Sequence, residues 1–115
     1  MIKLEKINGK PKLDREYEQY YKLIKDNKEI GYGTINKDKE DAFYIYINEG
    51  QRGNGYGKIL FAKILEESKD IGWSEPKITF EKENIPMTKI AVDNGAILFS
   101  SDGAMVKYVI ELNNR

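Results

Sequence analysis

Residues 48–58 read Asn48-Glu49-Gly50-Gln51-Arg52-Gly53-Asn54-Gly55-Tyr56-Gly57-Lys58, and they join the two most strongly patterned parts of the chain. Before them, residues 42–47 are dense in aromatic and β-branched side chains, a composition typical of a strand. After them, large apolar residues recur at three-to-four-residue steps between charged ones, at positions Ile59, Leu60, Ile64, Leu65 and Ile71. This period predicts an amphipathic helix that ends at Gly72. The glycine-rich segment therefore connects a strand to a helix N-terminus.

The glycines of this segment predict a phosphate site. Gly53, Gly55 and Gly57 carry no Cβ, so the backbone can adopt unusual torsions and turn successive N–H groups toward one point. At a helix N-terminus such a nest of amides binds phosphate. Arg52 and Lys58 add cationic donors that suit a pyrophosphate. The simpler alternative is that the glycines only permit a tight connection and bind nothing.

Two familiar nucleotide-binding loops do not match these residues. A Walker A loop would need a glycine at Arg52 and a serine or threonine at Ile59, and a dinucleotide loop would need a glycine at Lys58. The segment does match the pattern RxxGxG, through Arg52, Gly55 and Gly57. In this it resembles the acetyl-CoA pyrophosphate loop of the GNAT N-acetyltransferase superfamily.

A second match lies downstream. Members of this superfamily carry an asparagine that opens a helix, with a glycine eleven residues later, and Asn84 and Gly95 keep that spacing. Residues 84–96 resemble the CoA-side helix, residues 107–112 look like the final strand, and the likeness spans residues 22–112. Asn84 has a second interpretation as a helix N-cap, because its side-chain oxygen accepts an unpaired backbone N–H without any cofactor.

The remaining pattern completes a single domain over residues 1–115. Further strands are predicted at 2–7, 20–24, 30–35 and 77–81, a second helix from Pro86 to Asn94 and Gly95, and two strands flanking 101–103. The class is α/β of the α+β kind: a mixed, mostly antiparallel sheet with a β-α-β-α-β core. The crossover helix predicts one parallel strand pair.

The resemblance implies the acyl-CoA N-acyltransferase fold with much of its N-terminal helical pair missing. Typical members insert two helices that wall the acceptor pocket, and the connection at residues 8–19 has room for little more than a turn. An open acceptor side would suit a bulky or protein-borne amine, or a homodimer partner that completes the site.

The composition excludes several functions. Lysine plus arginine and aspartate plus glutamate both number 19, so no overall positive field favours nucleic acid or membrane lipid. Cysteine and histidine are absent, which removes disulfides, the Ser-His-Asp triad and ordinary zinc sites, and no metal is expected. No stretch approaches the roughly 18 apolar residues of a membrane span, and no signal peptide is visible, so a cytoplasmic protein is expected.

The resemblance implies acetyl-CoA as cosubstrate and transfer of its acetyl group to a primary amine by direct attack. In the superfamily the strand before the glycine loop splays from the next strand, and the pantetheine arm fills the gap. The corresponding segments here are 45–47 and 78–80. The cofactor-binding residues implied are Ile45, Ile47, Gln51, Arg52, Gly53, Asn54, Gly55, Tyr56, Gly57, Lys58 and Asn84.

The catalytic residues are less clearly indicated. Attack needs a neutral amine and hence a base, for which the acidic candidates are Glu81 and Glu49, with Tyr46 as a weaker one. Glu81 is our choice, although an exposed strand-end carboxylate without a role is about as common. Ala91 occupies the position where many members have a tyrosine that protonates the leaving thiolate.

Three functional alternatives follow from the sequence. The chain is an N-acetyltransferase for a small-molecule or protein amine, with Ala91 in place of the acid, or an acetyl-CoA-binding sensor or structural module with little turnover. A nucleic-acid or protein adaptor that uses the aromatic sheet face is the third, and the zero net charge disfavours it. Tyr32, Tyr44 and Tyr46 would line an acceptor groove in the first alternative.

Overall fold

The computed structural model describes residues 1–7, 18–36 and 43–112. In chain order its elements are β1 (Ile2–Ile7), β2 (Glu18–Lys25), β3 (Lys28–Asn36), β4 (Phe43–Ile47), α1 (Tyr56–Ile71), β5 (Lys77–Glu81), α2 (Ile85–Asp93), β6 (Ile97–Asp102) and β7 (Met105–Val109). The predicted element order is confirmed. Most of the short connection predicted after β1, and all but the first residue of the charged turn before β4, lie outside the described residues.

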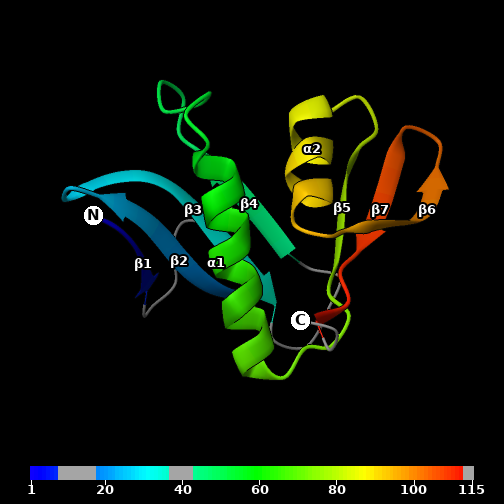
Figure 1. Ribbon diagram of the computed structural model, residues 1–115, viewed down its shortest axis with the longest axis horizontal. Helices are drawn as coiled ribbons and strands as arrows, with labels where there is room; N and C mark the ends of the chain where they lie inside the picture. The colour runs from blue at the N-terminus through cyan, green and yellow to red at the C-terminus, as the bar shows by residue number, and fades with distance from the viewer. Residues whose placement is uncertain (8–17, 37–42, 113–115) are drawn as a thin grey trace.

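The strands form two sheets (Figure 1). One has the order β1-β2-β3-β4 and the other the order β5-β7-β6. Every strand pair among the described residues is antiparallel, so the α+β class is confirmed and the predicted parallel pair is wrong. The crossover through α1 does bring β5 beside β4, and both strands run toward the glycine loop. Their backbones form no ladder, since β4 belongs to one sheet and β5 to the other.

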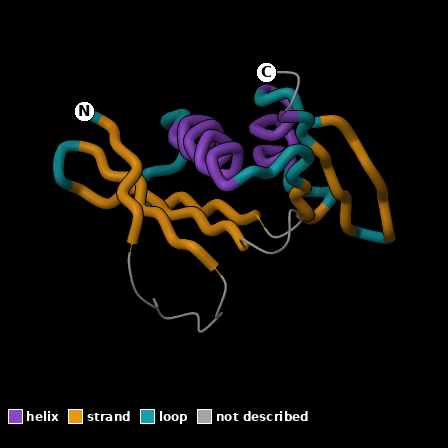
Figure 2. The backbone as a smooth tube through the Cα atoms, turned by 90° about the horizontal axis from the view of Figure 1, so that it is seen from below, coloured by secondary structure: helices purple, strands orange, loops and turns teal. Residues whose placement is uncertain are grey.

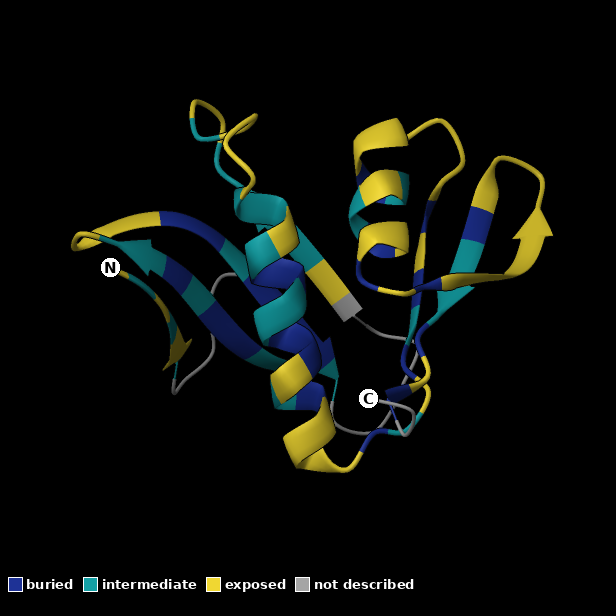
Figure 3. Ribbon diagram, in the orientation of Figure 1, coloured by how far each residue is buried: buried dark blue, intermediate teal, exposed yellow. Residues whose placement is uncertain are grey.

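Both helices lie on one side of the larger sheet (Figure 2). α1 packs on β3 and β4 and also contacts α2. The approach of α1 depends on Gly33, because a Cβ there would lie 2.8 Å from the side chain of Ile64. The core between helix and sheet includes five completely buried side chains, at Leu23, Ile35, Leu60, Phe61 and Ile64 (Figure 3). The opposite faces of both sheets carry no helix among the described residues, and we call them the helix-free side.

The element ends mostly follow the sequence signals. α1 ends at Gly72, whose φ of 106° places it in the left-handed region that suits glycine, as predicted. The last hairpin differs, since β6 continues through Asp102 and pairs it with Met105. The turn falls later than predicted because Gly103, with φ 62°, supplies its left-handed residue. None of the described helices is long and apolar enough to cross a membrane.

The ionisation of the buried Tyr21 hydroxyl limits the stability of this core at high pH. Burial raises the pKa of the Tyr21 hydroxyl from 10.0 to about 12, and the neighbouring carboxylates of Glu67 and Asp70 oppose ionisation further. Because the folded-state pKa is the higher one, this contribution to stability is intact below pH 10 and is lost as the pH rises through about 12. We expect Tyr21→Phe to flatten the fall in melting temperature over this range, measured by circular dichroism. The half-exposed Tyr44, changed to Phe, is the control, and equal pH profiles for Tyr21→Phe and the parent protein would contradict the assignment.

Candidate functional site

The glycine loop owes its shape to three left-handed residues. Gly50, Gly53 and Gly55 have φ values of 90°, 83° and 79°, in the region that side chains rarely adopt. A Cβ at any of them would meet nothing within 4 Å, so torsion and not crowding requires glycine. Two hydrogen bonds hold the turn, from the Gln51 N–H to the Asn48 carbonyl and from Asn54 Nδ2 to the Gln51 carbonyl. The loop is therefore preformed and open on its outer side.

The loop leads into the N-terminus of α1, which no side chain caps. Gly55 is the N-cap of α1, and no side chain caps this end or places an acidic group in its first turn. The N–H groups of Tyr56, Gly57 and Lys58 have no partner within the helix, as in the first turn of any α-helix. These donors and the positive end of the helix dipole favour an anion at this position. This geometry agrees with the predicted phosphate site.

Gly57 does not supply the unusual torsion predicted for it, and its role in cofactor binding remains a prediction. It lies inside α1 and is not among the glycines with positive φ. A Cβ at Gly57 would lie 2.7 Å from Cδ1 of Ile90 in α2. Its missing side chain therefore lets the first turn of α1 approach the second half of α2.

The two cationic residues of the loop point to different neighbours. Arg52 donates from Nε to the carbonyl of Ile47 over 3.0 Å, and its Cζ lies 5.2 Å from the ring centroid of Tyr46. The Nζ of Lys58 lies 3.9 Å from a carboxylate oxygen of Asp93 at the end of α2. One cation thus borders the end of β4 and the other borders α2.

Sequence reasoning missed one contact at this helix start. Lys25, at the end of β2, donates from Nζ to the Tyr56 hydroxyl over 2.9 Å. This hydrogen bond raises the pKa of Lys25. The pair connects β2 to the first residue of α1 and so helps to fix the helix start. Two residues 31 positions apart carry no local signal for such a contact.

The strands beside the loop leave a fork between the sheets. Ile45 and Ile47 of β4 are partly buried against the core, and Ile78 and Phe80 of β5 are buried within it. No backbone hydrogen bonds between β4 and β5 occur in the described ranges. Asn84 begins α2 beyond the end of β5, and its Oδ1 accepts the Met87 N–H over 3.1 Å. The N-cap interpretation of Asn84 is confirmed, and a cofactor role remains a prediction.

The two proposed catalytic residues lie on the strands that border this fork. Glu81 is the last residue of β5 and is exposed, on the face opposite Ile78 and Phe80. Tyr46 belongs to β4 and pairs in register with Tyr32 of β3. Because Gly31 and Gly33 face the helix, Tyr32 and Tyr46 face the helix-free side. Glu81 and Tyr46 therefore border the fork on the same side.

Three tyrosines form a row on that side. The ring centroid of Tyr32 lies 5.4 Å from that of Tyr46 and 6.0 Å from that of Tyr44. Partial burial, with the neighbouring Tyr44 hydroxyl, raises the pKa of Tyr32. The predicted grouping of these rings is confirmed, and their role toward an acceptor remains a prediction.

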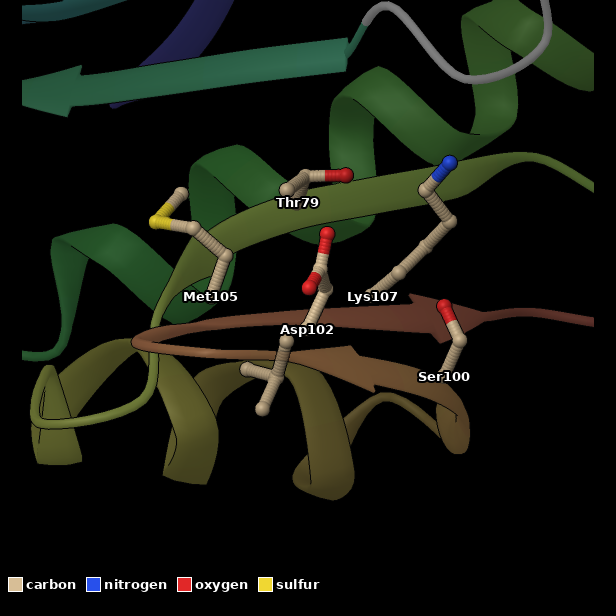
Figure 4. Close-up of a pocket in the computed structure, with 6 residues that line it drawn as sticks. Thr79, Ser100, Asp102, Met105 and Lys107 are labelled. Atoms are coloured by element: carbon tan, nitrogen blue, oxygen red, sulfur yellow. The ribbon is translucent and has the colours of Figure 1, made fainter.

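The smaller sheet carries a shallow depression on the same side (Figure 4). Its volume is about 370 Å³, and it is lined by Thr79, Ser100, Asp102, Met105, Val106 and Lys107. The side chains come from three neighbouring strands and follow no motif, so no local signal in the sequence marks this depression.

Ala91 is fully buried on the core side of α2. Its side chain offers no proton donor to the fork.

Both the sequence and the structure of this chain resemble those of known proteins. Residues 4–91 match the sequence profile described as the acetyltransferase (GNAT) family. A Bacillus subtilis acetyltransferase solved in complex with CoA superposes with a TM-score of 0.83 at 14% identity, over 97% of this chain and 99% of that one. The IAA acetyltransferase of Bacillus cereus gives 0.81 at 17% identity, over 97% and 100%.

A third solved structure was crystallised with the acetyl donor. The Campylobacter jejuni N-acetyltransferase PseH, in complex with acetyl coenzyme A, gives a TM-score of 0.75 at 17% identity, over 85% of this chain and 70% of that one. Among curated proteins no sequence matches. At these identities the structural likeness shows the fold.

Proposed function

Because the chain belongs to the GNAT acetyltransferase family, we propose that it is an N-acetyltransferase that moves an acetyl group from acetyl-CoA to a primary amine. One observation carries the proposal: a preformed glycine loop leads into an uncapped helix start beside two strands that do not pair. Acetyl-CoA, the acetyl donor of this family, is the cosubstrate. The three glycines with positive φ leave the loop open beside the first-turn amides of α1, and this supports an anion-binding role.

The residues at the fork fit this cosubstrate. The amides of Tyr56, Gly57 and Lys58, with loop residues 51–55, would hold the diphosphate. The edge of β4 at Ile45 and Ile47 would offer backbone groups to the pantetheine arm, apart from the Ile47 carbonyl, which accepts from Arg52. The Asn84 side chain retains its amide donors while its oxygen caps α2.

The reaction needs a base and a charge stabiliser. The amine nitrogen attacks the acetyl carbonyl carbon, the C–N bond forms, the C–S bond breaks, and coenzyme A leaves as the thiol. Glu81 takes the amine proton, directly or through water, with the Tyr46 hydroxyl as the weaker candidate. A backbone N–H of β4 would stabilise the charge that develops on the carbonyl oxygen.

Because residue 91 is an alanine, the departing thiolate must be protonated by another group. No proton donor stands at this position, so solvent or a tyrosine of the helix-free side must protonate the departing sulfur. A thiol with a pKa of about 8.5 leaves acceptably without such help, and the missing acid lowers the rate on the order of a hundredfold. We therefore expect a slow enzyme.

The function is tested by thiol release. The protein is mixed with acetyl-CoA and a panel of polyamines, amino acids and peptides, and free coenzyme A is measured. Amine-dependent release supports the transferase. Ala91 favours a second candidate, an acetyl-CoA sensor, for which tight binding in calorimetry without release above background would be the result.

Glu81→Gln tests the proposed base. We expect kcat to fall about a hundredfold, since general-base catalysis contributes roughly 10²–10⁴, while CoA affinity changes less than about twofold. Glu66→Gln, an exposed carboxylate on α1, is the matched control and keeps the parent rate. Unchanged turnover in Glu81→Gln would move the base to Glu49 or Tyr46.

The open acceptor side of the fork indicates how large an amine the protein can accept. The tyrosine row and the depression both lie on the helix-free side, which the described residues leave open. We propose a bulky or protein-borne amine, and the peptides in the panel test this directly. A preference for the smallest amines would contradict it.

A further inference from the structure

β6 is an outer strand whose free edge is apolar. It pairs only with β7 among the described strands, and all six of its residues are exposed (Figure 3). Ile97, Leu98 and Phe99 follow one another along it, with exposed fractions of 59%, 54% and 57%. A strand in this position presents a row of unpaired N–H and C=O groups together with a large apolar surface.

One of the two outer strands of the larger sheet, β1, has a different composition. β1 carries charges at Lys3, Glu5 and Lys6 within its six residues. Charged side chains on an edge strand oppose pairing with another chain. β6 has no charge before Asp102 and no proline, so it lacks these two protections, although its register with β7 shifts between Leu98 and Ser100.

We propose that two copies of this chain associate through β6, antiparallel about a two-fold axis, and join their smaller sheets into one. An identical strand is a self-complementary partner for such an edge. In this arrangement the two Asp102 carboxylates lie at opposite ends of the seam, roughly 17 Å apart at about 3.4 Å per residue. That separation exceeds the Debye length of about 8 Å, and the net charge of zero adds no repulsion between copies.

The size of the seam determines its strength. An aromatic side chain buries roughly 150–250 Å² when fully covered. Even if each of the three half-exposed side chains has about that size, together they contribute at most about 300 Å² per copy. The pair therefore buries about 600 Å² through them, well under half of a standard interface of about 1,600 Å². Backbone hydrogen bonds add to this, and a seam of this size forms a weak, transient dimer that is populated at high protein concentration.

The seam also borders the depression on the helix-free side. Ser100 and Asp102 of β6 line it together with Thr79, Met105 and Lys107 (Figure 4). Its outer margin is the free edge of β6, where the second copy would add a wall. Dimerisation thus completes a depression that one chain leaves open.

Sedimentation and light scattering test the seam. Over roughly 5 to 500 µM, mass action shifts the mass from the 13.3 kDa of one chain toward twice that value. Phe99→Lys raises the dissociation constant at least about tenfold, since it places two like charges in the seam. Ile71→Lys, an exposed apolar residue at the far end of α1, is the matched control and leaves the dimer intact.

Hydrogen exchange locates the interface. The amides of residues 97–102 gain protection as concentration rises, and Phe99→Lys abolishes the gain while its circular dichroism spectrum stays that of the parent. A protein that is monomeric throughout the range overturns the proposal. So does a dimer that survives Phe99→Lys or leaves the β6 amides unprotected. Neither measurement involves coenzyme A, so failure here is distinct from failure of the proposed activity.

Discussion

We expect Gly55→Val to lower the affinity for coenzyme A about 30- to 100-fold in isothermal titration calorimetry. Gly55 has a φ of 79°, and a β-branched side chain is strongly disfavoured there. The loop must relax, which moves the N-cap carbonyl that accepts the Ile59 N–H and turns the first-turn amides away. A hydrogen bond to a charged group contributes about 1.5–3 kcal/mol, so losing one or two of them accounts for the expected change.

Gly72→Val is the matched control for this experiment. Gly72 also lies in the left-handed region, with φ 106° and open space around a Cβ, but it is at the other end of α1. Valine there strains the backbone similarly and lowers stability, while coenzyme A affinity stays within about twofold of the parent. Equal affinities in Gly55→Val and the parent would remove the phosphate role of the loop. Equal losses in both variants would assign the effect to stability.

We expect Gly31→Ala to destabilise the fold by about 2 to 3 kcal/mol and to lower the melting temperature by about 10 °C. The added Cβ would lie 2.5 Å from the carbonyl oxygen of Tyr46 and 2.9 Å from Cδ1 of Ile47. A flexible side-chain end can move aside, but the Tyr46 carbonyl belongs to the β3–β4 ladder. The clash is therefore relieved only by shifting the strand that borders the fork.

Gly103→Ala is the comparison for Gly31→Ala. Gly103 has nothing within 4 Å of a Cβ and lies in an exposed turn, so its cost is limited to the strain of its positive φ. Thermal unfolding by circular dichroism separates the two. A fall in Gly31→Ala no larger than that in Gly103→Ala would show that β3 and β4 have more room than the structure gives them.

Local signals in the sequence were sufficient for the elements that depend on neighbouring residues. The three-to-four-residue period predicted α1, and Gly72 marked its end, because both act within a few residues of the chain. The glycine loop was recognisable for the same reason, since Gly53 and Gly55 supply torsions that other residues resist. The aromatic stretch before the loop likewise forms β4.

Features that depend on distant contacts were not predictable in this way. Gly57 looked like a third loop glycine, and only the position of Ile90 in α2 shows that it is a packing residue. The contacts of Arg52 with Tyr46 and with the carbonyl at the end of β4 have no local signal either, and its phosphate role remains a prediction. Lys25 joins Tyr56 without any local pattern at all.

The sequence by itself determined the order of elements, the glycine loop and the family resemblance, because torsions and periodicity are properties of short segments. Only the tertiary structure decided that β4 and β5 belong to two sheets without a parallel pair, that no side chain caps the start of α1, and that β6 has an apolar free edge. These depend on how helices pack across the chain, and packing free energy is set by contacts between residues far apart in sequence.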